Sequence, residues 1–288
     1  MDYYNLAIKR ESTRSYKKRS LTDEQLAAVQ ACFPECKRLL PELEMELKIL
    51  GHDAFTILPG CAGYHDFMIE APHYLLLLSS EGSHYLENAG YAGEDMVLKL
   101  ADMEIDTCWI TITDGEELKK RMGIQSDKKA AALIAFGDRA KIFPGSRLDI
   151  KSPSDVRIKQ RNGFIAPKLA VDSAVFDHTW GTDSDISSLP TNSSLYQAFI
   201  AACCSPTYLN LQPYRFIMDD DTIALICLED GLTDAADARL NAGIVMLNFA
   251  GVMGEHQHGK EASGWKPGAP EKHYDLPEKA WIAGYYKN

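Results

Sequence analysis

The chain has 288 residues, of which 45% are hydrophobic and 25% charged, the composition of an ordinary globular protein with enough residues for a sizeable core. Its formal net charge of −11 argues against non-specific binding to nucleic acid or to an anionic membrane surface. No apolar run approaches the roughly 18 residues that a membrane span needs, and the seven cysteines match no disulfide or zinc spacing, so we expect a cytoplasmic protein without a metal site.

Hydrophobic spacing predicts alternating helices and strands in the first part of the chain. Helices are expected over residues 3–10, 22–40, 86–103 and 116–122, and strands over residues 75–78, 105–111 and 131–137. Thr22 and Gln25 have the spacing of a capping box, which predicts where the second helix begins. Asp114 is expected to cap the short helix that follows it.

The remaining sequence predicts a second and shorter set of elements. They are a helix over 195–203, strands over 215–218 and 222–228 joined by a three-aspartate turn, and a long helix over 239–253. The polar, turn-rich stretch 177–194 is expected to link two halves, residues 1–176 and 195–288, that together form one compact unit. The tail from residue 264 is rich in proline, lysine and aromatic residues, and we expect it to wrap over the surface.

Two arginines and a serine lie close together near the N-terminus. Arg10, Ser12 and Arg14 fall within five residues. Two guanidinium groups and a hydroxyl can hold a phosphate through charge-assisted hydrogen bonds. The alternative is a solvated basic patch, since three further basic residues follow at 17–19.

A second polar cluster occupies residues 205–214, Ser-Pro-Thr-Tyr-Leu-Asn-Leu-Gln-Pro-Tyr. Pro206 is expected to end the preceding helix, because its ring fixes φ and it has no backbone N–H. Thr207, Asn210 and Gln212 offer a hydroxyl and two amides, whose donors and acceptors suit the polar edge of a planar heterocycle. The alternative is an ordinary turn between a helix and a strand.

Both clusters resemble signatures of the FMN-dependent nitroreductase family, in the order in which that family has them. The first, Arg-x-Ser-x-Arg-x-aromatic, is similar to the segment that binds the FMN phosphate and ribityl oxygens. The second is similar to a Ser-Pro-Ser-x-x-Asn-x-Gln-Pro-Trp loop that packs against the flavin ring. The resemblance implies that Pro206, Thr207 and Asn210 contact the ring, and that Gln212 braces the loop.

Residues 71–137 resemble the central block of the same family, with Ala-Pro before a strand, a long helix, a Cys-Trp-Ile strand, a short helix and a strand ending in glycine. In the family, backbone N–H groups after the Trp-Ile strand face flavin N5. This implies Thr111 as a backbone donor, although no glycine follows the strand here. Basic residues later in the family sequence reach the phosphate, which implies Arg147 and Arg161; the alternative is solvated charges on a loop.

Each signature occurs once, and the two lie in opposite halves of the chain. The sequence therefore resembles the duplicated branch of the family, in which one chain folds as a pseudo-dimer with one FMN between its halves. The tripeptide Asn-Ala-Gly at 88–90 recurs at 241–243, which fits a duplication. The implied fold is α+β and nitroreductase-like, with a mixed or antiparallel sheet flanked by helices in two pseudo-symmetric halves. A monomeric pseudo-dimer and a homodimer both fit.

The resemblance implies an oxidoreductase that uses FMN and NAD(P)H. Hydride would pass through flavin N5 to a nitroaromatic or quinone-like small molecule in a ping-pong sequence, and no side chain is needed as a covalent nucleophile. Two alternatives stay open. One is a non-catalytic flavin-binding protein, a store or a sensor, on the same fold. The other is a structural or partner-binding domain without a cofactor.

Overall fold

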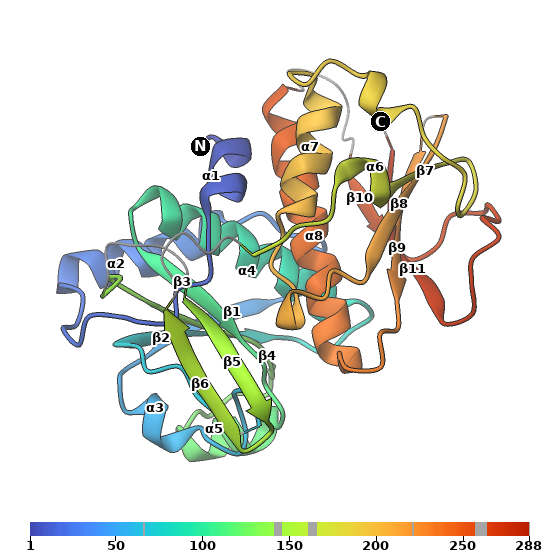
Figure 1. The fold of residues 1–288 in the computed structure, drawn as a ribbon. Coiled ribbons are helices and arrows are strands. Elements are labelled where there is room, and N and C mark those ends of the chain that lie inside the picture. Colours follow the sequence, from blue (N-terminus) through green and yellow to red (C-terminus); the bar gives the residue numbers. More distant parts are fainter. Residues whose placement is uncertain (66, 141–145, 161–165, 221, 257–263, 288) are drawn as a thin grey trace. The chain divides into compact units, whose positions relative to one another are not determined.

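The computed structural model describes residues 1–65, 67–140, 146–160, 166–220, 222–256 and 264–287. Through the contacts among its residues the chain divides into two compact units, each with its own sheet (Figure 1). Unit 1 contains Met1–Lys9, Leu86–Glu94 and Pro167–Asn288, and unit 2 contains Arg10–Tyr85 and Asp95–Ala166. The units interleave along the chain, whereas the halves inferred from the sequence are consecutive and stay a prediction.

Unit 2 is built on a four-stranded antiparallel sheet. Its strands are β1 (Met45–Leu50), β2 (His73–Ser79), β3 (Asp106–Ile110) and β4 (Lys129–Gly137), in the order β1-β2-β4-β3. β2 is buried at every position and β4 over its last seven, as expected of central strands. β1 is absent from the sequence prediction, although its apolar residues alternate with Glu46 and Lys48.

Helix α2 (Asp23–Cys32) starts at the predicted capping box. Thr22 Oγ1 accepts a hydrogen bond from Gln25 N at 3.2 Å, and Gln25 Oε1 accepts one from Thr22 N at 3.0 Å. The expectation that this helix runs to residue 40 is wrong. A short 3-10 turn, η1 (Phe33–Glu35), follows it directly, because Pro34 has no N–H for a further helical hydrogen bond.

The other local elements of unit 2 surround the sheet. α5 (Gly115–Arg121) begins at the predicted cap, where Asp114 Oδ1 accepts from Glu117 N at 2.9 Å, and it packs against β4. α3 (Ala54–Ile57) is a single turn. An antiparallel hairpin, β5 (Ser146–Ser152) with β6 (Asp155–Gln160), forms where the sequence analysis expects only a loop with scattered basic residues.

Unit 1 contains a mixed five-stranded sheet in the order β10-β11-β9-β8-β7. Its strands are β7 (Val175–Asp177), β8 (Tyr214–Asp219), β9 (Thr222–Leu228), β10 (Trp265–Pro267) and β11 (Ala280–Lys287). β7 and β8 are parallel and the other pairs antiparallel, so the predicted β8–β9 hairpin is confirmed. The expectation that the tail wraps over the surface is wrong, because β11 lies inside the sheet and buries Tyr286.

Helices of unit 1 pack on one another as well as on this sheet. α1 (Tyr3–Lys9) contacts both α7 (Ser194–Cys203) and α8 (Ala235–His256), and Figure 1 shows α7 and α8 side by side. Short turns, α6 (Val171–Ala174) and η2 (Ile186–Ser188), precede α7. α4 (Tyr85–Asp102) belongs to unit 1 over Leu86–Glu94 and to unit 2 from Asp95 onward.

The repeated Asn-Ala-Gly tripeptides bring α4 and α8 into close contact. A Cβ added to Gly90 would lie 3.0 Å from the carbonyl carbon of Leu240, and one added to Gly243 would lie 2.8 Å from the carbonyl carbon of Glu87. Gly90 therefore contacts the residue three positions before Gly243, and Gly243 contacts the residue three positions before Gly90. This reciprocal contact has local two-fold symmetry, and only glycine permits so close a backbone approach. It is a structural counterpart of the duplication indicated by the sequence.

The predicted fold class is confirmed. The chain is α+β, with an antiparallel sheet in unit 2 and a mixed sheet in unit 1, and helices accompany both. Across the part of the chain that the structure describes, no helix has both the length and the apolar character needed to cross a membrane.

Candidate functional site

The segment that follows α1 is fixed against β3. Its residue Ser12 bridges Thr107 in parallel, and Thr13 N donates to Thr107 O at 2.9 Å, so the backbone is extended there. Thr13 Oγ1 donates to Asp106 Oδ1 at 3.0 Å. Glu11 is held by Arg139, which also binds Asp106 at 2.6 Å. These contacts determine where residues 10, 12 and 14 of the segment lie.

The three predicted phosphate ligands gather around one buried thiol. Burial raises the pKa of the Cys108 thiol, while the charges of Arg14 and Arg10 and a hydrogen bond from Ser12 act in the opposite direction. Arg14 Nη1 also donates to Ser12 O at 3.1 Å. Arg10, Ser12 and Arg14 are therefore neighbours in space as well as in sequence. Two guanidinium groups and a hydroxyl at one place form a donor set that fits a phosphate.

The loop at 205–214 in unit 1 has an unusual backbone. Leu209, Asn210 and Gln212 have positive φ values of 48°, 59° and 53°. Left-handed backbone costs about 1–3 kcal/mol for a residue other than glycine, and such residues persist only where their surroundings hold them. Asparagine tolerates this conformation well, but leucine and glutamine do not. The backbone of this loop therefore depends on contacts from its surroundings, and its role at a flavin ring stays a prediction.

Side chains of the loop bind the segment that precedes α6. Gln212 Oε1 accepts from Leu169 N at 2.7 Å, and Gln212 Nε2 donates to Pro167 O at 3.2 Å and to Asn210 O at 3.1 Å. Both amide hydrogens of Gln212 are therefore used inside the chain, which is the geometry of a brace. Asn210 Nδ2 donates to Pro167 O at 2.8 Å. Asn210 Oδ1 accepts from Lys168 Nζ at 3.0 Å. These two contacts use one hydrogen and one lone pair of an amide that has two of each, so the Asn210 amide has the capacity to meet a polar ring edge as well.

The start of the loop is anchored to α8. Asn248 Nδ2 donates to Ser205 Oγ at 2.8 Å, and both side chains are buried. Unit 2 has a similar contact, in which Asp95 Oδ2 accepts from Lys37 N at 3.0 Å just after η1. Asp95 follows Gly90 by five positions, as Asn248 follows Gly243. α4 and α8 therefore each use the residue five positions after their glycine to bind the chain segment that follows an earlier helix. This equivalence again fits a duplication.

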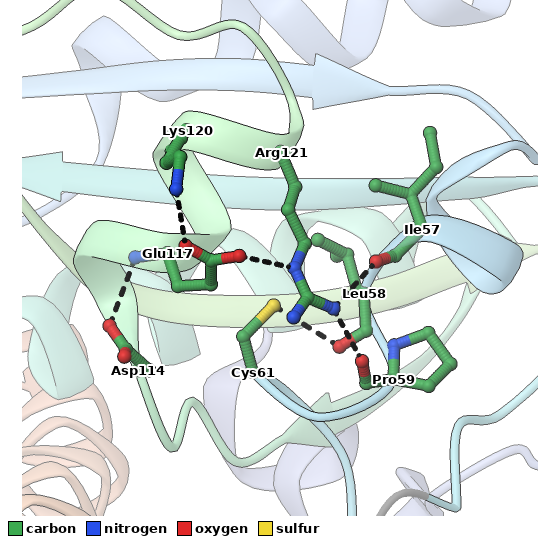
Figure 2. Close-up of polar contacts among 8 residues, drawn as sticks. All are labelled: Ile57, Leu58, Pro59, Cys61, Asp114, Glu117, Lys120 and Arg121. Atoms are coloured by element: carbon green, nitrogen blue, oxygen red, sulfur yellow. Dashed lines mark hydrogen bonds and ion pairs between the residues drawn. The ribbon is translucent and has the colours of Figure 1, made fainter.

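Thr111, the predicted backbone donor, directly follows β3. Its carbonyl accepts from Gly63 N at 2.9 Å, and Thr113 N and Asp114 N both donate to Cys61 O. The 61–63 turn is fixed in its place by Arg121, whose Nη1 donates to Pro59 O at 2.7 Å and to Ile57 O at 3.3 Å (Figure 2).

Figure 2 also shows how that arginine is held. Arg121 Nε binds Glu117 Oε1 at 2.8 Å, and Glu117 N is bound by Asp114. The end of β3 is thus braced from α5 through a chain of hydrogen bonds within unit 2.

Arg147 and Arg161 are the two other basic residues predicted to bind the phosphate. Arg147 lies in β5, where its Nη2 is 3.9 Å from Asp149 Oδ1. Arg161 lies outside the described residues. Both stay predictions as phosphate ligands.

Sequence reasoning missed three residues of this arrangement. Cys108 was noted only as part of a buried strand, and Asn248 only as part of a long helix. Lys168 was grouped with the scattered basic residues, yet its Nζ donates to Ser205 O at 2.9 Å and to Asn210 Oδ1 at 3.0 Å. A lone asparagine inside an apolar helix is the one sequence signal that could have drawn attention to Asn248.

Comparison with known proteins identifies the family of the chain. A family model described as "Putative TM nitroreductase" matches residues 2–250. A crystal structure described as a putative nitroreductase from Thermotoga maritima MSB8 has a TM-score of 0.60 at 13% identity, covering 100% of this chain and 94% of that one. An FMN-dependent nitroreductase from Clostridium difficile R20291 matches at 17% identity over 47% of this chain and 87% of its own, with a low TM-score of 0.41.

A search among curated proteins found no match. The family model covers most of the chain, and the Thermotoga structure shares its fold along the whole length. The chain therefore belongs to the TM nitroreductase family.

Proposed function

We propose that the chain binds one FMN and works as an NAD(P)H-dependent oxidoreductase of nitroreductase type. The observation that carries the proposal is the gathering of Arg10, Ser12 and Arg14 around Cys108. Ser12 is hydrogen-bonded to the buried Cys108 thiol, and the charges of both arginines act on that thiol, so the three side chains approach one end of β3. Two guanidinium groups and a hydroxyl at one place suit an anion such as a phosphate.

The loop at 205–214 would bind the flavin ring. Pro206 and Thr207 would contact it, Asn210 would hydrogen-bond its polar edge, and Gln212 would hold the loop in shape through its three backbone contacts. Thr111 would add a backbone donor from the end of β3. The left-handed residues support this assignment, because strained backbone is commonly retained where a ligand binds.

Bound FMN would supply the hydride chemistry, and the side chains of this protein would bind and orient it. The acceptor class that we propose, nitroaromatic or quinone-like molecules, follows from membership of the family. Ping-pong kinetics would appear as parallel lines in double-reciprocal plots with NAD(P)H and acceptor varied. Intersecting lines would contradict that order of events.

Comparing FMN with riboflavin tests the phosphate assignment, because riboflavin lacks the phosphate. Replacing Arg10 and Arg14 together by alanine should weaken FMN binding on the order of a hundredfold or more, since each charge-assisted hydrogen bond contributes roughly 1.5–3 kcal/mol. Riboflavin binding should barely change. The control is Arg19→Ala, which removes an exposed arginine that binds Asp138 instead. Equal losses for both flavins would refute the assignment.

Anaerobic addition of NADH or NADPH then tests the reaction. A yellow protein that is bleached by either reductant supports the oxidoreductase. A yellow protein that neither reductant bleaches supports a flavin store or sensor. A colourless protein that rejects added FMN supports the domain without a cofactor and ends the proposal.

A further inference from the structure

Lys168 reaches into the 205–214 loop. Its ammonium group donates to Ser205 O and to Asn210 Oδ1, at 2.9 and 3.0 Å. The resemblance places basic residues of this region at the phosphate, but these contacts place Lys168 with the loop that we assign to the ring.

Lys168 contributes to the orientation of the Asn210 amide. An ammonium group has three donors and no acceptor, so only the oxygen of the amide can face it. The carbonyl of Pro167 only accepts, and it receives Nδ2 of the same amide at 2.8 Å. The two contacts together fix which way the amide faces.

Lys168 also helps to hold the strained turn. The chain from Leu209 to Gln212 contains three left-handed residues. Its hydrogen bonds run from Asn210 N to Thr207 O at 2.9 Å, from Leu211 N to Tyr208 O at 3.0 Å and from Gln212 N to Thr207 Oγ1 at 3.1 Å. A backbone of this kind also needs contacts from outside the turn. Lys168 supplies such a contact at Asn210 and ties it to Ser205, which precedes the turn.

We propose that Lys168 is a positioning residue of this loop, which helps to orient the Asn210 amide and to hold the left-handed turn. The parts that concern flavin rest on the proposed function above. The part that concerns the loop does not, and it can be tested without a cofactor.

Hydrogen exchange of the cofactor-free protein tests the loop. Lys168→Gln keeps a polar side chain but removes the charge and one of the three donor hydrogens. It should speed exchange at the amides of Asn210 and Gln212 by about tenfold or more, and Lys168→Arg should restore part of the protection. The control is Lys266→Gln in β10, an exposed lysine of the same unit. Unchanged exchange in Lys168→Gln would overturn the proposal.

Flavin binding tests the assignment to the ring. Lys168→Gln should weaken FMN and riboflavin by the same factor, whereas loss of FMN binding alone would place Lys168 at the phosphate and overturn the proposal.

These outcomes separate the two proposals. Wild-type protein that binds neither flavin refutes the proposed function, while hydrogen exchange still decides whether Lys168 holds the loop. Wild-type protein that binds FMN, combined with exchange that Lys168→Gln leaves unchanged, refutes the role of Lys168 alone.

Discussion

Replacing Gly90 or Gly243 by alanine should destabilise the protein through the contact between α4 and α8. The added Cβ would lie 3.0 Å from the carbonyl carbon of Leu240 in one case and 2.8 Å from that of Glu87 in the other, and closer to the oxygens. Since the obstacle is helix backbone, the helices must move apart. Overpacking of this kind costs about 1–3 kcal/mol, and the clash with backbone puts it at the upper end. Alanine regains about 1 kcal/mol of helix propensity, so each variant should lose about 2 kcal/mol.

The symmetry of the contact makes the double variant the stronger test. One separation of the two helices relieves both clashes, so the double variant should lose clearly less than the sum of the single losses, by about 1 kcal/mol or more. Urea unfolding followed by circular dichroism measures all three. The control is Gly51→Ala, whose Cβ would lie 3.0 Å from Oδ1 of the exposed Asp53, the end of a side chain that can turn aside. Neutral or stabilising single variants, or strictly additive losses, would refute the close symmetric crossing.

Two further predictions concern unit 1 and unit 2 separately. In unit 1, a hydrogen bond from His178 Nδ1 to Asp219 raises the pKa of His178, so the stabilisation is fully present below about pH 6.5 and is lost as the pH rises through the higher folded value. His178→Asn introduces a residue that tolerates the left-handed backbone at this position. The free energy of unfolding of this variant should therefore lie below that of wild type at pH 6, and the deficit should be much smaller at pH 9. A deficit that does not change with pH would contradict this. In unit 2, Thr22→Ala should cost about 1 kcal/mol by removing the α2 cap, and Thr22→Ser should restore most of it. Equal denaturation midpoints for wild type and Thr22→Ala would show that the capping box does not stabilise the fold.

Local signals predicted much of the fold. The capping box at Thr22 and the cap at Asp114 act within one helical turn, and both are confirmed. The end of α2 was misplaced although Pro34 marked it, because the apolar spacing continued beyond the proline. β11 could not be predicted in the same way, since its pairing with β9 joins residues more than fifty positions apart, such as Ala280 with Leu228. A strand of this kind is decided by its partner rather than by its own composition.

In the candidate site, too, residues with a local sequence pattern could be predicted, and residues placed by distant contacts could not. Arg10, Ser12 and Arg14 could be found because one extended segment carries all three, and Cys108 enters only when β3 lies beside them. Lys168 had no local pattern to distinguish it from its basic neighbours. Its contacts with Ser205 and Asn210 depend on two segments about forty residues apart, which the sequence does not bring together.

Calorimetric titration of the cofactor-free protein with FMN tests the central claim most directly. The phosphate ligands and the ring loop each occur once in the chain, so the account predicts saturation at one FMN per chain, and loss of that binding in the Arg10→Ala, Arg14→Ala double variant. No binding, or two equivalent FMN per chain, would contradict it.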